Sequence, residues 1–312
     1  MEKPLVSIVV CCHNRRHYLE QTMQSVFAQT YRPVEIVVLD DGSTDGTDEL
    51  MRGYGDRIRY HWQQNRGIAA TRTAACRLAK GEFIAFQDDD DLMAPERIVK
   101  LHDALVEYPS AVFSVGDYAL IDPDGHLTGA RWMPGTLDET DKPRLIEDAH
   151  AAVLWPKVPG VPHTTLFRAA DGERVGWFDE AFKYACSDAD FFARLARLGP
   201  IVYVREIVSY YRRGHSAMWN NQLRADYSRL QLFEKHLGLE AGGNEAFRKR
   251  LRFRLRQMLV QVARQKHQGM RVAESGLEVY VRRGLEMLGW GDRLLYKWHD
   301  SVKFPLKNLV RK

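Results

Sequence analysis

Four consecutive aspartates, Asp88 to Asp91, are the residues whose type and spacing point most directly to chemistry. Adjacent carboxylates repel one another, so keeping all of them ionised costs free energy. A hard divalent cation with oxygen ligands relieves that repulsion and can bridge one or two carboxylates to the phosphates of a substrate. The alternative is a solvated acidic loop, or a charge cluster in which Asp91 favours a helix beginning near Pro95. An apolar segment at 82–86, typical of a buried strand, directly precedes the run and favours the metal-binding interpretation.

A second acidic cluster, Asp40-Asp41-Gly42-Ser43, ends another apolar run. A carboxylate at this position can accept a hydrogen bond from the imide N–H of a uracil or thymine ring, or from a ribose hydroxyl. The competing interpretation is an Asx-type turn, in which Thr44 or Asp45 caps the helix that follows. The residue types alone favour neither interpretation.

Apolar runs alternate with helical patterns along the first part of the chain, which is typical of a parallel, doubly wound α/β sheet. In such sheets ligands lie beyond the carboxyl ends of the strands, so the polar clusters at 13–16, 40–45 and 88–91 are expected to converge on one edge. Further along, 201–211 is extended, and from about residue 224 the pattern is helical and basic. Buried strands are predicted at 5–12 and 34–39, further strands at 57–62, 82–86 and 112–121, and helices over 67–80, from Pro95 and over 188–198.

Composition describes an ordinary globular chain with a basic end. Of its 312 residues, 45% are hydrophobic and 28% are charged, and the net charge is +4. Residues 245–312 hold 17 Lys and Arg against 6 Asp and Glu, an asymmetry that often marks contact with an anionic partner. The four cysteines lack metal-ligand spacing, which predicts buried free thiols in a reducing compartment. Without a recognisable secretory signal or membrane-spanning run, we expect a cytoplasmic protein, either soluble or peripheral at the inner face of the membrane.

Several motifs follow one another along residues 5–105. They are Leu5-Val6-Ser7-Ile8-Val9-Val10, His13-Asn14-Arg15, Ser25 to Thr30, Glu35 to Thr47, Gly67 to Arg72, Gly81-Glu82-Phe83-Ile84, and Asp88 to Asp91 followed by Pro95. In their order and spacing they resemble family-2 glycosyltransferases, with weaker matches up to about residue 216. The resemblance implies a GT-A fold, in which a nucleotide-sugar-binding half, residues 1–110, joins an acceptor-binding and catalytic half, residues 111–222. Residues 223–312 would then form a helical, basic C-terminal extension.

The same resemblance implies roles for individual side chains. Asp90 is the expected ligand for Mn²⁺ or Mg²⁺, with His215 as a second ligand, although four successive aspartates leave the register open by one. Arg72 lies in Thr71-Arg72-Thr73, where the family often has Ala-Arg-Asn, so a helix-surface arginine is its alternative role. His163 is expected to bind the acceptor, the alternative being a structural histidine. Contacts to the nucleotide sugar are expected from Cys11, His13, Arg15, Asp41, Arg72, Asp88, Asp89 and Arg212.

Asp188 matches the position of the catalytic base in the family. The base of an inverting transferase must be a carboxylate that deprotonates the acceptor hydroxyl as its oxygen attacks the anomeric carbon. The transition state resembles an oxocarbenium ion, and a metal ion rather than a protonated acid stabilises the leaving diphosphate. Ser187 stands where the family usually has Glu before the base, and a helix cap is the alternative role for Asp188.

These features predict an inverting, hexosyltransferase-type enzyme that moves a sugar from UDP or dTDP to a hydroxyl of a glycan or lipid-linked acceptor, in bacterial surface polysaccharide or glycoconjugate synthesis. Other nucleotide-binding classes lack their signatures, since Cys12-His13-Asn14-Arg15 follows the first strand instead of Gly-x-Gly-x-x-Gly and no P-loop occurs. The alternative is an inactive transferase-like scaffold that binds membrane or nucleic acid. Because the aspartates are intact, we expect activity and no nucleic-acid partner.

The basic C-terminal region, residues 245–312, interleaves cations with aliphatic and aromatic side chains. That mixture suits the interface of an anionic bilayer, where each basic residue contributes on the order of 1 kcal/mol. Peripheral membrane contact through this region is therefore one prediction. A helical subdomain that packs on the catalytic core, with its charges solvated, is the other.

Overall fold

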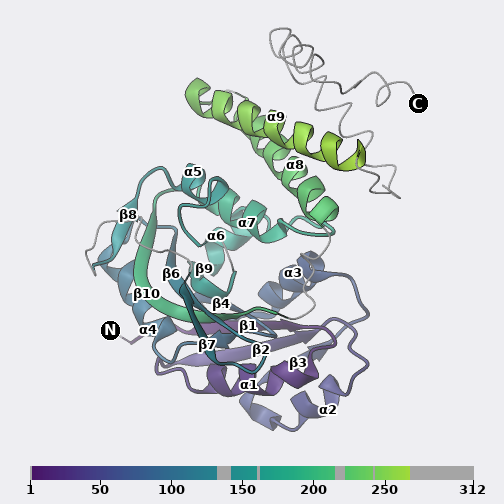
Figure 1. Ribbon diagram of the computed structural model, residues 1–312. Helices are drawn as coiled ribbons and strands as arrows, with labels where there is room; N and C mark the ends of the chain where they lie inside the picture. The colour runs from purple at the N-terminus through teal and green to yellow at the C-terminus, as the bar shows by residue number, and fades with distance from the viewer. Residues whose placement is uncertain (1, 132–141, 160–161, 215–221, 242, 268–312) are drawn as a thin grey trace. The chain divides into compact units, whose positions relative to one another are not determined.

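The protein is described by a computed structural model that covers residues 2–131, 142–159, 162–214, 222–241 and 243–267 (Figure 1). The chain divides into two compact units, unit one within Met1–Lys183 and Ser187–Ser216 and unit two within Tyr184–Cys186 and Ala217–Lys312. Unit one carries the candidate site. The three-part division predicted at residues 110 and 222 stays a prediction.

The amino-terminal part of unit one alternates strands with helices, as predicted. Apolar and β-branched runs form the strands, and every predicted strand bound lies within two residues of the observed one. Gly67 precedes the third helix with a φ of +85°, a conformation that glycine adopts without strain. The elements are β1 (Val6–Cys12), α1 (Arg16–Phe27), β2 (Val34–Asp40), α2 (Thr47–Arg52), η1 (Gly55–Arg57), β3 (Arg59–Trp62), α3 (Ile68–Leu78) and β4 (Phe83–Asp88).

The rest of unit one adds shorter and less regular elements. Two of the longer ones were expected, because the helix predicted from Asp188 begins at Ser187 and the extended segment predicted at 201–211 is a single strand. The elements are β5 (Leu92–Met93), α4 (Arg97–Glu107), β6 (Phe113–Ile121), β7 (Leu127–Arg131), β8 (Arg144–Ile146), α5 (Ala149–Leu154), η2 (Pro162–Thr164), β9 (Thr165–Arg168), α6 (Ala169–Arg174), α7 (Ser187–Leu195) and β10 (Ile201–Arg212).

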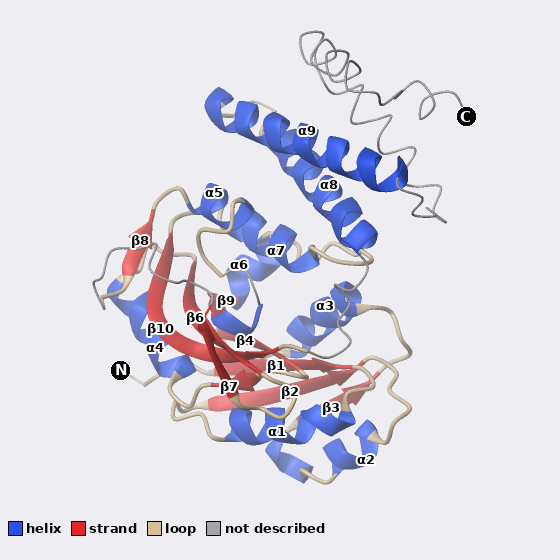
Figure 2. Cartoon of the chain, viewed as in Figure 1, coloured by secondary structure: helices blue, strands red, loops and turns tan. Residues whose placement is uncertain are grey.

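The described strands form one mixed sheet with the order β3-β2-β1-β4-β9-β6-β10-β5, while β7 pairs with β6 and β8 with β10 (Figure 2). Strands β3, β2, β1 and β4 run parallel, whereas β9 is antiparallel to both β4 and β6. The predicted α/β fold with a mostly parallel sheet is therefore confirmed. In the register Cys12 lies opposite Asp40, and Cys11 lies opposite Asp88. The carboxyl ends of these three strands thus meet at one edge, as expected for a ligand site.

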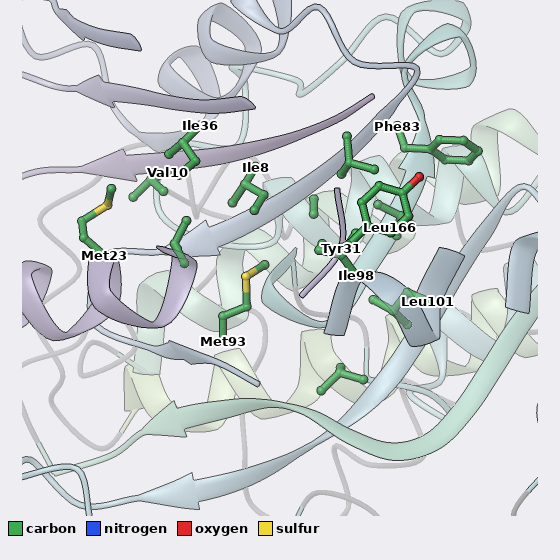
Figure 3. Close-up of a cluster of buried hydrophobic side chains, with 14 of the residues drawn as sticks. Ile8, Val10, Met23, Tyr31, Ile36, Phe83, Met93, Ile98, Leu101 and Leu166 are labelled. Carbon is green, nitrogen blue, oxygen red and sulfur yellow. The ribbon is translucent and has the colours of Figure 1, made fainter. Parts of the chain in front are cut away.

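One face of the central strands packs against α1 and α4 and forms the main hydrophobic core (Figure 3). Ile8 and Val10 on β1 belong to the same buried cluster as Met23 on α1 and Ile98 on α4. Burying each such side chain contributes about 1.5–3 kcal/mol relative to leaving it exposed. Successive residues of a strand point to opposite faces, so Cys11 projects away from this core, toward the face where α3 packs.

Unit two contains, among its described residues, the helices α8 (Gln222–Leu239) and α9 (Glu245–His267), which pack against each other. Leu251, Leu255 and Leu259 of α9 are buried, while Phe253 keeps 58% of its surface exposed. The helical pattern predicted from about residue 224 is thus observed as far as residue 267, and residues 268–312 lie outside the described part. No helix among the described residues is long and apolar enough to cross a bilayer.

Candidate functional site

Asp88 ends β4 and the next three aspartates form a tight loop that leads to β5; with Asp88 they are called the aspartate loop. Side chains from two other elements hold its backbone. Thr22 on α1 donates from Oγ1 to the carbonyl oxygens of Asp89 and Asp91, at 3.2 and 2.9 Å. Arg212, the last residue of β10, donates from Nε to the Asp90 carbonyl at 2.7 Å and from its backbone N to Asp91 Oδ1 at 2.8 Å. The loop conformation is therefore fixed by donors that are distant in sequence.

Electrostatics within the loop favour a bound cation. Arg72 on α3 donates from Nη2 to Asp88 Oδ1 at 2.8 Å. Burial raises the pKa of Asp88, but the charge and hydrogen bond of Arg72, together with other nearby basic groups, outweigh burial, and the pKa lies below its usual value. Burial raises the pKa values of Asp89 and Asp91 well above their usual range, and in both cases the charge of Asp90 adds to the rise. A divalent ion would offset this repulsion, so the loop fits such an ion.

Two aspartates of the loop form a second group of possible metal ligands together with a histidine from η2. Side-chain ligand atoms of Asp88, Asp91 and His163 all lie within 4.8 Å of one another. Asp91 Oδ2 and His163 Nε2 face each other at 3.5 Å, and neither atom has a hydrogen-bond partner among the described residues. Two carboxylates and an imidazole suit Mn²⁺ or a similar ion. The predicted ligand Asp90 contributes no atom to this grouping, and its other predicted partner, His215, lies outside the described residues.

His163 is more deeply buried than the predicted contact with an acceptor suggests. Its side chain, in η2, is 1% exposed, its ring stacks on Tyr211 at 5.3 Å between centroids, and its Nδ1 lies 2.7 Å from Ser209 Oγ. Burial lowers the pKa of His163 to about 4, so the ring is uncharged at neutral pH. Binding of the acceptor by His163 stays a prediction. The buried, stacked ring has the surroundings of a structural histidine, which was the alternative interpretation.

The two aspartates at the end of β2 have different partners. Asp40 forms the predicted turn by accepting the backbone N–H of Ser43 at 2.8 Å. Asp41 instead accepts the backbone N–H groups of Arg66 and Gly67, both at 2.9 Å, and therefore fixes the start of α3. Gly46, not Thr44 or Asp45, occupies the cap position of α2. Contact between Asp41 and a base stays a prediction.

The turn after β1 connects the loops that follow β2 and β4. The backbone N of His13 donates to Asp89 Oδ2 at 3.0 Å, and the backbone N of Asn14 donates to Ser43 Oγ at 2.9 Å. Asn14 has a φ of +53°, a conformation that asparagine tolerates better than most residues. Arg15 acts electrostatically on Asp89. The predicted nucleotide contacts at 13, 15, 41 and 89 thus lie together at one edge.

Arg72 connects the aspartate loop to the predicted base. It is 7% exposed and lies near the rings of Phe86 and Phe178, its guanidinium carbon 6.0 and 5.7 Å from their centroids. Burial lowers the pKa of Arg72, but the charges of Asp88 and Asp188 outweigh burial and raise it. Arg72 is therefore not the helix-surface arginine of the alternative interpretation.

Cys11 lies close to the same charges. Burial raises the pKa of its thiol to about 12, and the nearby Arg72 opposes this rise. The thiol is therefore uncharged at neutral pH, and all four cysteines are free and buried, as predicted. A contact between Cys11 and the nucleotide sugar stays a prediction.

Asp188 lies in the first turn of α7, one residue after the helix begins at Ser187. Asp188 therefore lies inside the helix and not before its first residue, and its Oδ1 accepts the Ala189 N–H at 2.8 Å. Burial raises the pKa of Asp188, while Arg72 opposes the rise and Asp88 adds to it. These influences show that Asp188 lies near Arg72 and Asp88, so the structure brings the predicted base close to the aspartate loop.

Arg212 has a different environment from the one expected of a phosphate ligand. Its side chain is 1% exposed. Besides the Asp90 carbonyl, its guanidinium donates to the carbonyl oxygens of Asp122 and Pro123, at 3.3 and 2.7 Å, and to Gln21 Oε1 at 2.9 Å. Contact between Arg212 and a diphosphate stays a prediction.

Comparison with solved structures shows that the fold is shared with glycosyltransferases. S. aureus TarS 1-349 in complex with UDP-GlcNAc superposes with a TM-score of 0.61 at 19% identity, covering 81% of this chain and 71% of TarS 1-349. Mannosyltransferase PcManGT from Pyrobaculum calidifontis, in complex with GDP-Man and Mn²⁺, gives 0.58 at 15% identity, covering 99% of this chain and 84% of PcManGT. At these identities the likeness establishes the GT-A fold alone.

Sequence comparison adds closer relatives. The chain is 30% identical over 224 residues to the uncharacterized glycosyltransferase RT0329 of Rickettsia typhi, covering 70% of this chain and 66% of that protein, just under two thirds of its length. It is 35% identical over 127 residues to a glycosyltransferase of Bacillus subtilis, TuaG, named for teichuronic acid biosynthesis, covering 39% and 50%. The model of glycosyl transferase family 2 matches residues 7–171, more than half of the chain. The chain therefore belongs to glycosyl transferase family 2.

Proposed function

We propose that this protein is an inverting, metal-dependent glycosyltransferase. The observation that carries the proposal is the arrangement around Arg72, which bonds to Asp88 of the aspartate loop and interacts electrostatically with Asp188. A donor phosphate site and a basic carboxylate are thereby held close together, as a displacement at the anomeric carbon requires. Family membership and the shared fold support the same chemistry.

In the proposed reaction Asp188 takes the proton of an acceptor hydroxyl while that oxygen attacks the anomeric carbon of the donor. The bond to the nucleoside diphosphate breaks in the same step, and the single displacement inverts the configuration. A Mn²⁺ or Mg²⁺ ion held by Asp90 would supply positive charge to the leaving diphosphate. The raised pKa of Asp188 makes it a stronger base than an ordinary aspartate, and Arg72 keeps its ionised form accessible.

We propose UDP or dTDP as the nucleotide and a glycan or lipid-linked hydroxyl as the acceptor, in bacterial surface polysaccharide or glycoconjugate synthesis. The complexes of TarS with UDP and UDP-GlcNAc support a uridine nucleotide, and the teichuronic acid relative supports a surface polymer. The Mn²⁺ in the PcManGT complex supports a divalent ion. The nucleic-acid alternative has no specific support among the described residues.

The proposal is tested by measuring donor binding and turnover on the full chain. Because a ligand that binds only the folded state raises the melting temperature, we expect UDP or dTDP to raise it in the presence of Mn²⁺ and to do so less after chelation. UDP-sugars with Mn²⁺ should then show release of UDP, faster with acceptor. If no nucleotide or nucleotide sugar shifts the melting temperature or turns over, the scaffold alternative replaces the enzyme.

We also propose that the basic region 245–312 contacts an anionic membrane, which would place the enzyme at the cytoplasmic face near a lipid-linked acceptor. The specific observation is the outer face of α9, where Lys249, Arg250 and Arg254 are exposed around the exposed ring of Phe253. Residues three and four apart lie on one face of a helix, so these side chains form one cationic surface with an apolar centre. Such a surface suits the headgroup region of anionic lipids.

Liposome co-sedimentation tests this contact. We expect the full chain to sediment with phosphatidylserine-containing vesicles at low salt and much less with phosphatidylcholine vesicles. Replacing Phe253 by Ser together with Lys249 and Arg250 by Gln should reduce binding about tenfold or more, since each basic residue contributes on the order of 1 kcal/mol. As a control, Trp62→Ser removes an exposed aromatic of unit one and should leave sedimentation unchanged. A chain that stays in the supernatant with anionic vesicles contradicts the membrane proposal.

A further inference from the structure

Three successive carbonyl oxygens of the aspartate loop accept hydrogen bonds from just two side chains. Thr22 Oγ1 reaches the carbonyls of Asp89 and Asp91, and Arg212 Nε reaches the carbonyl of Asp90 between them. Both donors are buried, at 0% and 1% exposure. Thr22 and the Arg212 guanidinium thus hold the loop by its backbone, while the backbone N–H groups of His13 and Arg212 bond to carboxylates of Asp89 and Asp91.

Arg212 also ties the loop to two other segments. Its Nη1 donates to the carbonyls of Asp122 and Pro123 in the turn after β6, and its Nη2 donates to Gln21 on α1. Its backbone N donates to Asp91 Oδ1. A planar guanidinium with fixed donor directions can satisfy these partners together, whereas the compact ammonium of lysine cannot. Arg212 therefore acts as a rigid connector within unit one.

We propose that Arg212 and Thr22 are positioning residues that preorganise Asp90 for the metal ion, and that Arg212 does not itself bind the donor. This inference rests on the proposed function, in which Asp90 holds the ion. Residues that orient a metal ligand typically affect metal affinity about 10–100-fold when they are replaced. The donors bond to the backbone on both sides of the Asp90 side chain, so they set the direction in which its carboxylate projects.

The test measures Mn²⁺ affinity in the presence of UDP, and UDP affinity without metal, on the full chain. Arg212→Lys keeps the positive charge but loses the planar guanidinium and its several donors, and we expect it to weaken Mn²⁺ binding about tenfold or more. Thr22→Val removes only the hydroxyl, and we expect about a fivefold loss, the effect of one net hydrogen bond. Both variants should bind UDP without metal as the parent does, because neither side chain contacts the donor in this proposal.

Arg168→Lys is the matched control. Arg168 on β9 also donates from its guanidinium to a backbone carbonyl, that of Ala111 at 2.7 Å, but it lies outside the aspartate loop. A general loss of stability should lower its melting temperature without changing Mn²⁺ affinity. Should Arg212→Lys melt below the assay temperature, Thr22→Val carries the same test.

Each outcome decides the inference. Parent-like Mn²⁺ affinity in Arg212→Lys and Thr22→Val, with affinity lost in Asp90→Ala, overturns the positioning role while the proposed metal site stands. A drop in metal-free UDP affinity in Arg212→Lys, with Thr22→Val unaffected, identifies Arg212 as a direct donor ligand and also overturns it. Parent-like Mn²⁺ affinity in Asp90→Ala removes the proposed metal position itself, and the inference with it.

Discussion

Replacing Asp188 by asparagine is expected to lower kcat about a hundredfold or more while leaving the Kd for UDP within about twofold of the parent value. The amide has nearly the same shape as the carboxylate but cannot take a proton from the acceptor. Asp188 does not belong to the aspartate loop, so the donor should still bind. Single-turnover transfer and nucleotide binding by calorimetry measure the two quantities separately.

The pH dependence gives an independent readout of the same variant. Because burial raises the pKa of Asp188 above 3.8, transfer by the parent should fall as pH drops through this raised pKa and the base becomes protonated. The asparagine variant should lack that acid limb. Asp171→Asn is a matched control, since Asp171 lies in the first turn of α6 as Asp188 lies in the first turn of α7. Near-normal transfer by the Asp188 variant would leave that residue with a structural role alone.

Asp90→Ala should abolish the increase in UDP affinity that Mn²⁺ produces, while the fold survives. The variant removes one of four mutually repelling carboxylates, so it relieves repulsion at the same time as it removes the expected ligand. Calorimetric titration of UDP with and without Mn²⁺ measures the difference, and the melting temperature reports the fold. Asp124→Ala is the control, because Asp124 belongs to a separate, exposed acidic group with Asp122 and His126.

The same titration locates the ion among the aspartates. If Asp90→Ala keeps full metal enhancement and Asp91→Asn loses it, the ion is held by the group of Asp88, Asp91 and His163 instead. Asp91 is fully buried and its Oδ2 faces His163 Nε2, so this second outcome has a defined geometry. It would contradict Asp90 as the ligand and shift the register by one residue.

Local sequence patterns were sufficient for the longer strands, β1 to β4, β6 and β10, and for the edge of the sheet where the site lies. Continuous apolar runs such as Val6–Cys12 have no polar face to leave in solvent, so a buried strand is the only regular structure that suits their length. Polar residues follow these strands directly, and parallel strands must end at a common edge. The insertion of β9 antiparallel between β4 and β6 was not predictable, because Thr165–Arg168 is a short apolar run that carries no information about direction.

Some site residues could be predicted from the sequence and others could not. Asp88, Asp89 and Asp188 were recognisable from their types and from the family resemblance, and the structure brings Asp188 close to Asp88. Thr22 gave no signal, since a threonine inside a helical pattern resembles many others and its partners lie 67 and 69 residues away. Arg212 was predicted to bind the donor from the family resemblance, but its residue type does not distinguish a phosphate ligand from a side chain whose donors are bonded to carbonyls. Such distinctions depend on tertiary contacts that no local pattern encodes.

The late position of β10 in the chain has a consequence for biosynthesis. A ribosome releases the four aspartates and the parallel block β3-β2-β1-β4 more than a hundred residues before it releases Arg212. Nascent chains fold from the amino terminus, so the nucleotide-side strands can form first. Until β10 takes its place between β6 and β5, however, the Asp90 carbonyl and the Asp91 carboxylate lack their bonds from Arg212. The complete set of bonds to the aspartate loop therefore forms only after Arg212 has been translated.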